Sequence, residues 1–147
     1  MGTTGGGGLC PETVDGRNDI CYHAWASHPT ISSQVFEYQV KVTGTLTSIT
    51  LKERYEKARP IALSRIAMKR ESDGAIIKEF DFQPATTSWK DRVLKADLEL
   101  NDELVRIQLR LCAFECYPFG GDYTSYLHVA MMRLQGDETT VFEPLPL

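Results

Sequence analysis

From about residue 33 onward, apolar and polar side chains alternate along the chain with a period of two. The clearest runs place charged or amide side chains between their apolar residues, which are Phe36, Tyr38, Val40 and Val42 in one run and Val105, Ile107, Leu109 and Leu111 in another. Successive side chains of a β-strand point to opposite faces, so this alternation predicts strands with one buried and one solvated face. It is the feature that most restricts the fold, and it favours a β-sheet protein.

Turn-forming residues separate these runs. Glu71-Ser72-Asp73-Gly74 predicts a tight hairpin between two strands, because Asp-Gly supplies the positive φ that such turns require. Gly44 and the Asn101-Asp102-Glu103 stretch are expected to end strands, and a last long strand is expected over residues 123–134. Pro144 and Pro146 are expected to end the fold.

These elements predict an all-β fold, with a single antiparallel β-sandwich or jelly-roll domain of about seven to eight strands over residues 33–147. Residues 1–32 are expected to form an irregular N-terminal segment that packs on the sheet, and their glycine-rich start, residues 1–8, a flexible leader. A chain of 147 residues is long enough to fold as one domain without a metal.

Four cysteines, Cys10, Cys21, Cys112 and Cys116, bear on the compartment. On one regular strand, Cys112 and Cys116 would lie about 13 Å apart, which is too far for a disulfide. We therefore expect each of them to bond to one of the two N-terminal cysteines, which predicts a secreted protein. Two alternatives stay open: four reduced, buried thiols in a cytoplasmic protein, and a zinc site of non-standard spacing.

Composition and the absence of motifs exclude several classes of function. The net charge of −4 gives no overall attraction to nucleic acid, and no stretch approaches the length of a membrane-spanning helix. The chain has no glycine-rich phosphate loop, dinucleotide fingerprint or metalloprotease helix motif. We expect no cofactor, no nucleic-acid partner and no membrane insertion, and the oligomeric state stays open.

A basic stretch provides the first candidate binding residues. Residues 41–70 contain eight of the sixteen lysines and arginines, against only Glu53 and Glu56. The candidates within it are Lys52, Arg54, Lys69 and Arg70. A basic face on an acidic protein can bind acidic partners or sulfated glycans. The alternative is ordinary protection of sheet edges by charged side chains.

Aromatic residues in expected loops provide the second set, namely Trp25, Trp89, Phe119 and Tyr123. Such rings grip proteins or sugars with large contact area and little entropy cost, although they can also fill a core. The preferred interpretation is a secreted, non-enzymatic recognition domain that binds a protein or a glycan through these loops or the basic face.

Other groupings support different classes of function. A small hydrolase or lyase would use His128 with carboxylates in a sheet concavity, drawn from Asp81, Asp97, Glu99 and Glu115. His23, His28 and His128 would bind a metal if they converge, and residues 15–19 have the composition of a calcium loop without its spacing. An assembly subunit that uses a sheet edge is a third class. No metal site is expected.

Overall fold

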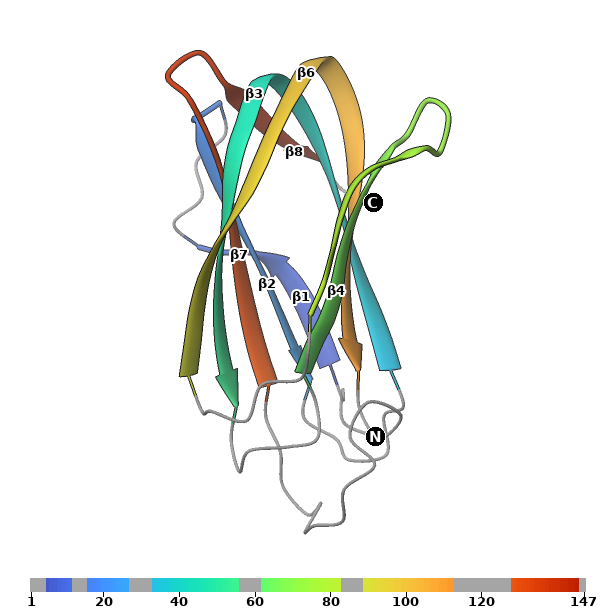
Figure 1. Ribbon diagram of the computed structural model, residues 1–147, viewed down its shortest axis with the longest axis vertical. Coiled ribbons are helices and arrows are strands. Elements are labelled where there is room, and N and C mark those ends of the chain that lie inside the picture. The colour runs from blue at the N-terminus through green and yellow to red at the C-terminus, as the bar shows by residue number, and fades with distance from the viewer. Residues whose placement is uncertain are drawn as a thin grey trace, which may run out of the picture.

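A computed structural model describes residues 5–11, 16–26, 33–55, 62–82, 89–112 and 128–145, which form one antiparallel sheet of eight strands that is not closed (Figure 1). In chain order the strands are β1 (Gly5–Leu9), β2 (Asp19–Ala26), β3 (Ser33–Tyr55), β4 (Ala62–Arg70), β5 (Ile76–Asp81), β6 (Trp89–Cys112), β7 (His128–Gly136) and β8 (Val141–Leu145). The predicted all-β fold is confirmed. Within the described ranges no helix is long and apolar enough to cross a membrane.

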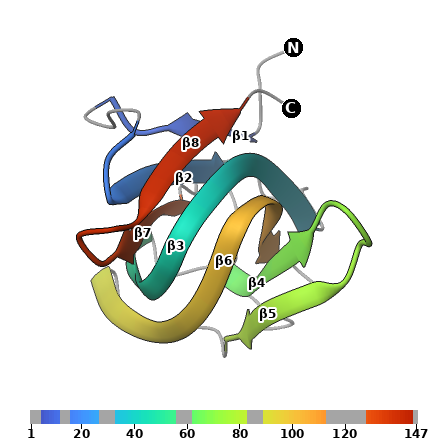
Figure 2. The same cartoon turned by 90° about the horizontal axis from the view of Figure 1, so that it is seen from above.

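The long strands β3 and β6 pair along their whole length and bend together over one end of the molecule (Figure 1). This arch divides the sheet into two layers that face each other. Layer A contains β5, β4, the second half of β6, the first half of β3, and β8. Layer B contains the first half of β6, the second half of β3, β7, β2 and β1 (Figure 2).

Two β-bulges bend the arch. In each bulge, two consecutive residues of β6 oppose a single residue of β3. The second of these two β6 residues is an aspartate with positive φ, which is Asp97 (49°) in one bulge and Asp102 (58°) in the other. Aspartate tolerates this conformation better than most residues, and a bulge increases the local bend and twist. The expectation that Gly44 and residues 101–103 end strands is therefore wrong, because both strands continue through the bend.

The core lies between the two layers and consists of the apolar residues that alternate in the sequence. From layer A these include Val40, Val42, Ile107 and Leu109, and from layer B Ile49, Leu51, Met132 and Leu134, all of them buried. Tyr22 of layer B stacks on Tyr38 of layer A with ring centroids 4.5 Å apart. The predicted inward faces of β3 and β6 are confirmed, whereas Ile76 of β5, predicted to face inward, is exposed.

Residues 5–9 and 19–26 form strands β1 and β2, so the irregular segment and the flexible leader expected there are corrected. The glycines of β1 fit because large neighbours occupy the space that side chains would need. A Cβ at Gly6 would lie 3.0 Å from Nε1 of Trp25, and one at Gly7 would lie 2.4 Å from the hydroxyl oxygen of Tyr38. Packing against these rings therefore offsets the low strand propensity of glycine.

The predicted hairpin is confirmed as β4–β5. The amide of Arg70 donates to the carbonyl of Ala75 at 2.8 Å, and Gly74 takes φ of 71°. The last long strand is described from residue 128 to 136, and residues 123–127 lie outside the described part. Pro144, expected to end the fold, lies inside β8 opposite Val40.

Candidate ligand-binding face

The register of layer B brings together four of the predicted binding residues. Trp25 of β2 pairs with Val129 of β7, which pairs with Arg54 of β3, which in turn pairs with Trp89 of β6. Lys52 lies two residues before Arg54 on β3. The backbones of residues far apart in the sequence thus form one row across four strands. The side chains of Arg54 and Trp89 lie outside the described part.

Trp25 is the described aromatic residue of this row. Its ring is half-buried and lies over Gly6 of β1, so the missing side chain of that glycine makes room for it. A ring held against a strand in this way loses little further freedom when it contacts a ligand.

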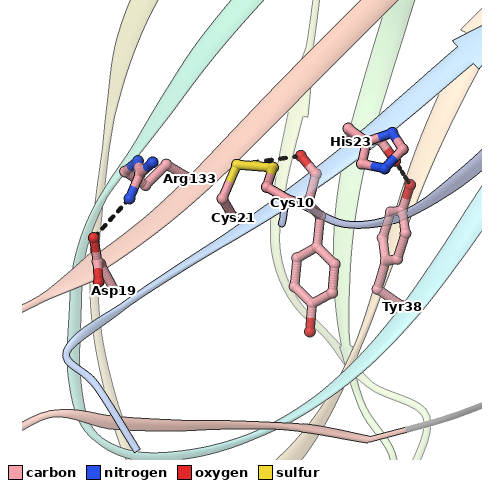
Figure 3. Close-up of a disulfide and its surroundings, with 7 residues drawn as sticks. Cys10, Asp19, Cys21, His23, Tyr38 and Arg133 are labelled. Atoms are coloured by element: carbon pink, nitrogen blue, oxygen red, sulfur yellow. Dashed lines mark hydrogen bonds and ion pairs between the residues drawn. A yellow bond between two sulfur atoms is a disulfide. The ribbon is translucent and has the colours of Figure 1, made fainter. Parts of the chain in front are cut away.

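The neighbouring part of the outer face is basic and apolar. Lys52 is exposed and forms no ion pair with the residues that the structure describes. With Met131, Arg133, Thr50 and the disulfide-bonded Cys21 it lines a shallow hollow of about 70 Å³. Arg133 binds Asp19 at 2.7 Å, which holds its guanidinium at the edge of the hollow (Figure 3).

Cys10 and Cys21 form a disulfide, with their Cα atoms 5.3 Å apart and both side chains buried (Figure 3). The bond joins the end of β1 to β2, and the Cys10 amide also donates to the Cys21 carbonyl at 2.9 Å. The expected bonds from these two cysteines to Cys112 and Cys116 are therefore wrong. The side chain of Cys112 and the whole of Cys116 lie outside the described residues. The Cys10–Cys21 disulfide is compatible with an oxidising compartment.

The basic residues of the 41–70 stretch do not form one face. Lys52 lies in layer B, whereas Lys69 and Arg70 lie on β4 in layer A. Arg70 is bound by Glu103 at 3.0 Å and Asp73 at 3.3 Å, and the hydrogen bond to Glu103 raises the pKa of Arg70. Lys41 is likewise bound by Asp102 at 3.2 Å. The register of the sheet thus separates residues that are close in sequence.

Phe119 and Tyr123 lie outside the described residues, but the strands that flank them are described. The register pairs Ala26 and Tyr55 with His128, and Ser33 and Ala62 with Cys112. The described strand ends at Ala26, Ser33, Tyr55, Ala62, Cys112 and His128 therefore lie at one end of the molecule (Figure 1). The prediction that aromatic loops gather there stays a prediction.

The residues of the enzyme and metal hypotheses are not brought together in the described part. Asp97 and Glu99 are exposed on the first half of β6 in layer B, and Asp81 is exposed on β5 in layer A. His28, Glu115 and the side chain of His128 lie outside it. Asp19, from the expected calcium loop, binds Arg133 instead. Among described side chains, no three of His, Cys, Asp and Glu are grouped so that they could hold a metal ion.

A buried ion pair was not expected from the sequence. Glu53 is fully buried and binds Arg92 of β6 at 3.3 Å, while the guanidinium of Arg92 lies 4.7 Å from the centre of the Phe82 ring. The alternation of the sequence could have indicated this burial, because Glu53 follows the inward-facing Ile49 and Leu51 at the same spacing of two residues. The ion pair lies between the layers and not on the outer face, so it is a structural feature.

Neither a scan against protein-family models nor a search of the curated proteins finds a match to this chain.

Proposed function

We propose that this protein is a non-enzymatic recognition domain, secreted into an oxidising compartment, that binds an acidic protein partner through the outer face of layer B. The observation that carries the proposal is the row of Trp25, Val129, Arg54 and Trp89 across four strands, with Lys52 and Met131 in the next row.

The residue types in these two rows are those that protein interfaces favour. Tryptophan, methionine and arginine are enriched in interface cores, and tryptophan and arginine are frequent hot spots of binding energy. The cations favour a partner with negative charge, because complementary potentials guide association and orient the two surfaces.

The shape of the face supports a macromolecular partner. Its hollow of about 70 Å³ is much smaller than the ~300 to 1,000 Å³ of typical small-molecule pockets. The apolar side chains of Val129 and Met131 favour a protein over a glycan, since sugars offer mostly hydroxyl groups to them. A glycan is therefore the second outcome that an experiment must distinguish.

A selection from a phage-displayed library of random peptides tests the proposal. We expect the wild-type protein to enrich peptides rich in aspartate and glutamate, and Lys52→Glu to weaken their binding by about tenfold or more through charge reversal at a contact. The matched control is Lys95→Glu, which makes the same charge change at another exposed position of layer B, on β6.

The opposite results are equally clear. Equal weakening by Lys52→Glu and Lys95→Glu would mean that only overall charge matters. Absence of enriched peptides, together with saturable binding to a sulfated glycan array, would replace the protein partner with a glycan. Trp25→Phe should also weaken peptide binding, because the smaller ring offers less contact area.

A further inference from the structure

The outer face of layer A contains a hollow of about 370 Å³ centred on Ala67 of β4. Ala67 points away from the core, yet it is only 4% exposed, because the longer side chains around it cover it. In the register of the sheet its neighbours are Gln108 on one side and Glu79 on the other. A large side chain at position 67 would occupy the hollow, so the hollow exists because this residue is small.

Positive charges surround Ala67 in an unusual arrangement. Arg65 of β4 lies directly opposite Arg110 of β6, and Lys69 lies directly opposite Arg106. Neighbouring strands are about 4.8 Å apart, and like charges placed directly opposite each other destabilise a sheet. Two such pairs, separated by the single outward-facing pair of Ala67 and Gln108, concentrate positive potential on one small area.

Carboxylates bind Arg65 and Arg106 among these cations. Arg65 binds Glu79, with Asp81 at 3.9 Å, and Arg106 binds Glu37 at 2.6 Å and Glu71 at 2.5 Å. Lys69 has no carboxylate within ion-pair distance among the described residues. Lys69, Arg110 and Arg65 all line the hollow, and none of the acidic side chains that the structure describes does.

We infer that the hollow at Ala67 binds an oxyanion, a phosphate, sulfate or carboxylate group, between the cationic groups of Arg65, Lys69 and Arg110. Guanidinium and ammonium groups form strong charge-assisted hydrogen bonds to such anions. A bound anion would also relieve the repulsion between the paired cations. This site goes beyond the proposed function, since it lies in the other layer and uses none of the residues of the face in layer B.

Titration with inorganic phosphate, sulfate and glutarate, followed by NMR shifts of backbone amides at constant ionic strength, tests the inference. We expect a saturable response at residues lining the hollow, and a loss of it in Ala67→Leu, which fills the hollow and changes no charge. Leucine at an outward strand position should not disturb the fold, because alanine is a poor strand former. The three anions distinguish a tetrahedral dianion from an organic carboxylate as the preferred chemistry.

Lys69→Gln provides a second variant that removes one cation and keeps the hollow. We expect it to weaken anion binding by about tenfold, the effect of losing one charged hydrogen bond. Lys95→Gln, which removes an exposed lysine of layer B, should leave the binding unchanged. No saturable response to any of the three anions in the wild-type protein, or equal binding by wild type, Ala67→Leu and Lys69→Gln, would overturn the inference.

Discussion

At the scale of single residues, Tyr38 makes a polar connection between the two layers. Its side chain is 7% exposed, its ring stacks on Tyr22, and its hydroxyl donates to the backbone carbonyl of His23 at 2.5 Å (Figure 3). Burial raises the pKa of Tyr38, because the charged phenolate is disfavoured away from water. The hydroxyl group of Tyr38 thus stabilises the fold at neutral pH and makes its stability depend on pH in the alkaline range.

Tyr38→Phe tests this role. We expect the free energy of unfolding at pH 7 to fall by about 1 kcal/mol, because the carbonyl of His23 loses its donor while the ring is kept. A group with a raised pKa stabilises the fold below its unfolded pKa, about 10 for tyrosine, and loses that contribution as pH rises. The deficit of the variant should therefore shrink above pH ~10, as measured by urea unfolding from pH 7 to pH 11. A deficit that stays constant across this range would show that Tyr38 ionises equally in both states.

Thr140, in the turn between β7 and β8, is a second buried residue whose hydroxyl bonds to the backbone of another strand. It is 2% exposed, and its hydroxyl donates to the carbonyl of Thr45 at 2.7 Å and accepts from the amide of Asp137 at 3.1 Å. Its side chain fits because two glycines adjoin it. A Cβ at Gly136 would lie 2.3 Å from Cβ of Thr140, and Gly44 approaches the Thr140 backbone at positive φ.

Gly136→Ala should therefore destabilise the protein by about 1–3 kcal/mol, the usual effect of overpacking. The matched control is Gly8→Ala, also in a strand, where the nearest atom to a new Cβ is 3.9 Å away. We expect that variant to keep or slightly raise stability, since alanine restricts the unfolded chain more than glycine does. Thermal unfolding of both variants compares the two effects, and equal midpoints would contradict the packing argument.

At the scale of elements, the sequence predicts the faces of strands better than their ends. The period of two correctly identifies the inward residues of β3 and β6, because one buried face determines it locally. Gly44 and Asn101-Asp102 have the composition of turns, and a bulge requires the same residue types as a turn. The difference depends on the partner strand, which continues to pair past the bend.

Strand β1 and the candidate site also depend on pairing between strands, so the local sequence does not predict them. The glycines of β1 have no side-chain alternation to detect, and their pairing with β2 depends on Trp25, Tyr38 and the Cys10–Cys21 disulfide. Residue type alone suggests Trp25 and Lys52 as binding residues. Their proximity to Arg54 and Trp89 depends on the register between strands far apart in the sequence, which no local pattern contains.

The bulge at Asp97 can be tested within β6. Asp97 is exposed and has φ of 49°, a conformation that a β-branched residue strongly disfavours. We expect Asp97→Val to lower the free energy of unfolding by about 1–2 kcal/mol and Asp97→Gly to leave it nearly unchanged. Glu99→Val, two residues further along the same exposed side, is the control and should be neutral or stabilising. If Asp97→Val proves as stable as Glu99→Val, the strand does not require the left-handed conformation at this position.

At the scale of the whole molecule, carboxylates hold parts of the arch and its turns together. Arg106 of β6 bonds to Glu37 of β3 and to Glu71 in the β4–β5 turn, and these bonds lower the pKa of both carboxyl groups. The amide of Ala75 lowers the pKa of Asp73, and the hydroxyl of Thr139 lowers that of Asp137. The contacts that depend on ionised acids therefore involve β3, β6, the β4–β5 turn and the β7–β8 turn.

Because these carboxyl groups have lowered pKa values, we expect the free energy of unfolding to decrease as the pH falls. A carboxyl group with a lowered pKa stabilises the fold above its unfolded pKa, about 4.3 for glutamate, and loses that contribution as pH falls toward the folded value. We expect the stability of the wild-type protein to decline below pH ~4.3.

Arg106→Gln should be less stable than wild type at pH 7 and should show a shallower decline, because Glu37 and Glu71 then lose the partner that lowers their pKa. Lys95→Gln should keep the wild-type slope in chemical unfolding between pH 3 and pH 7. Parallel curves for wild type and Arg106→Gln would mean that the network of Arg106 does not couple folding to protonation, and that the acid response arises from Asp73 and Asp137.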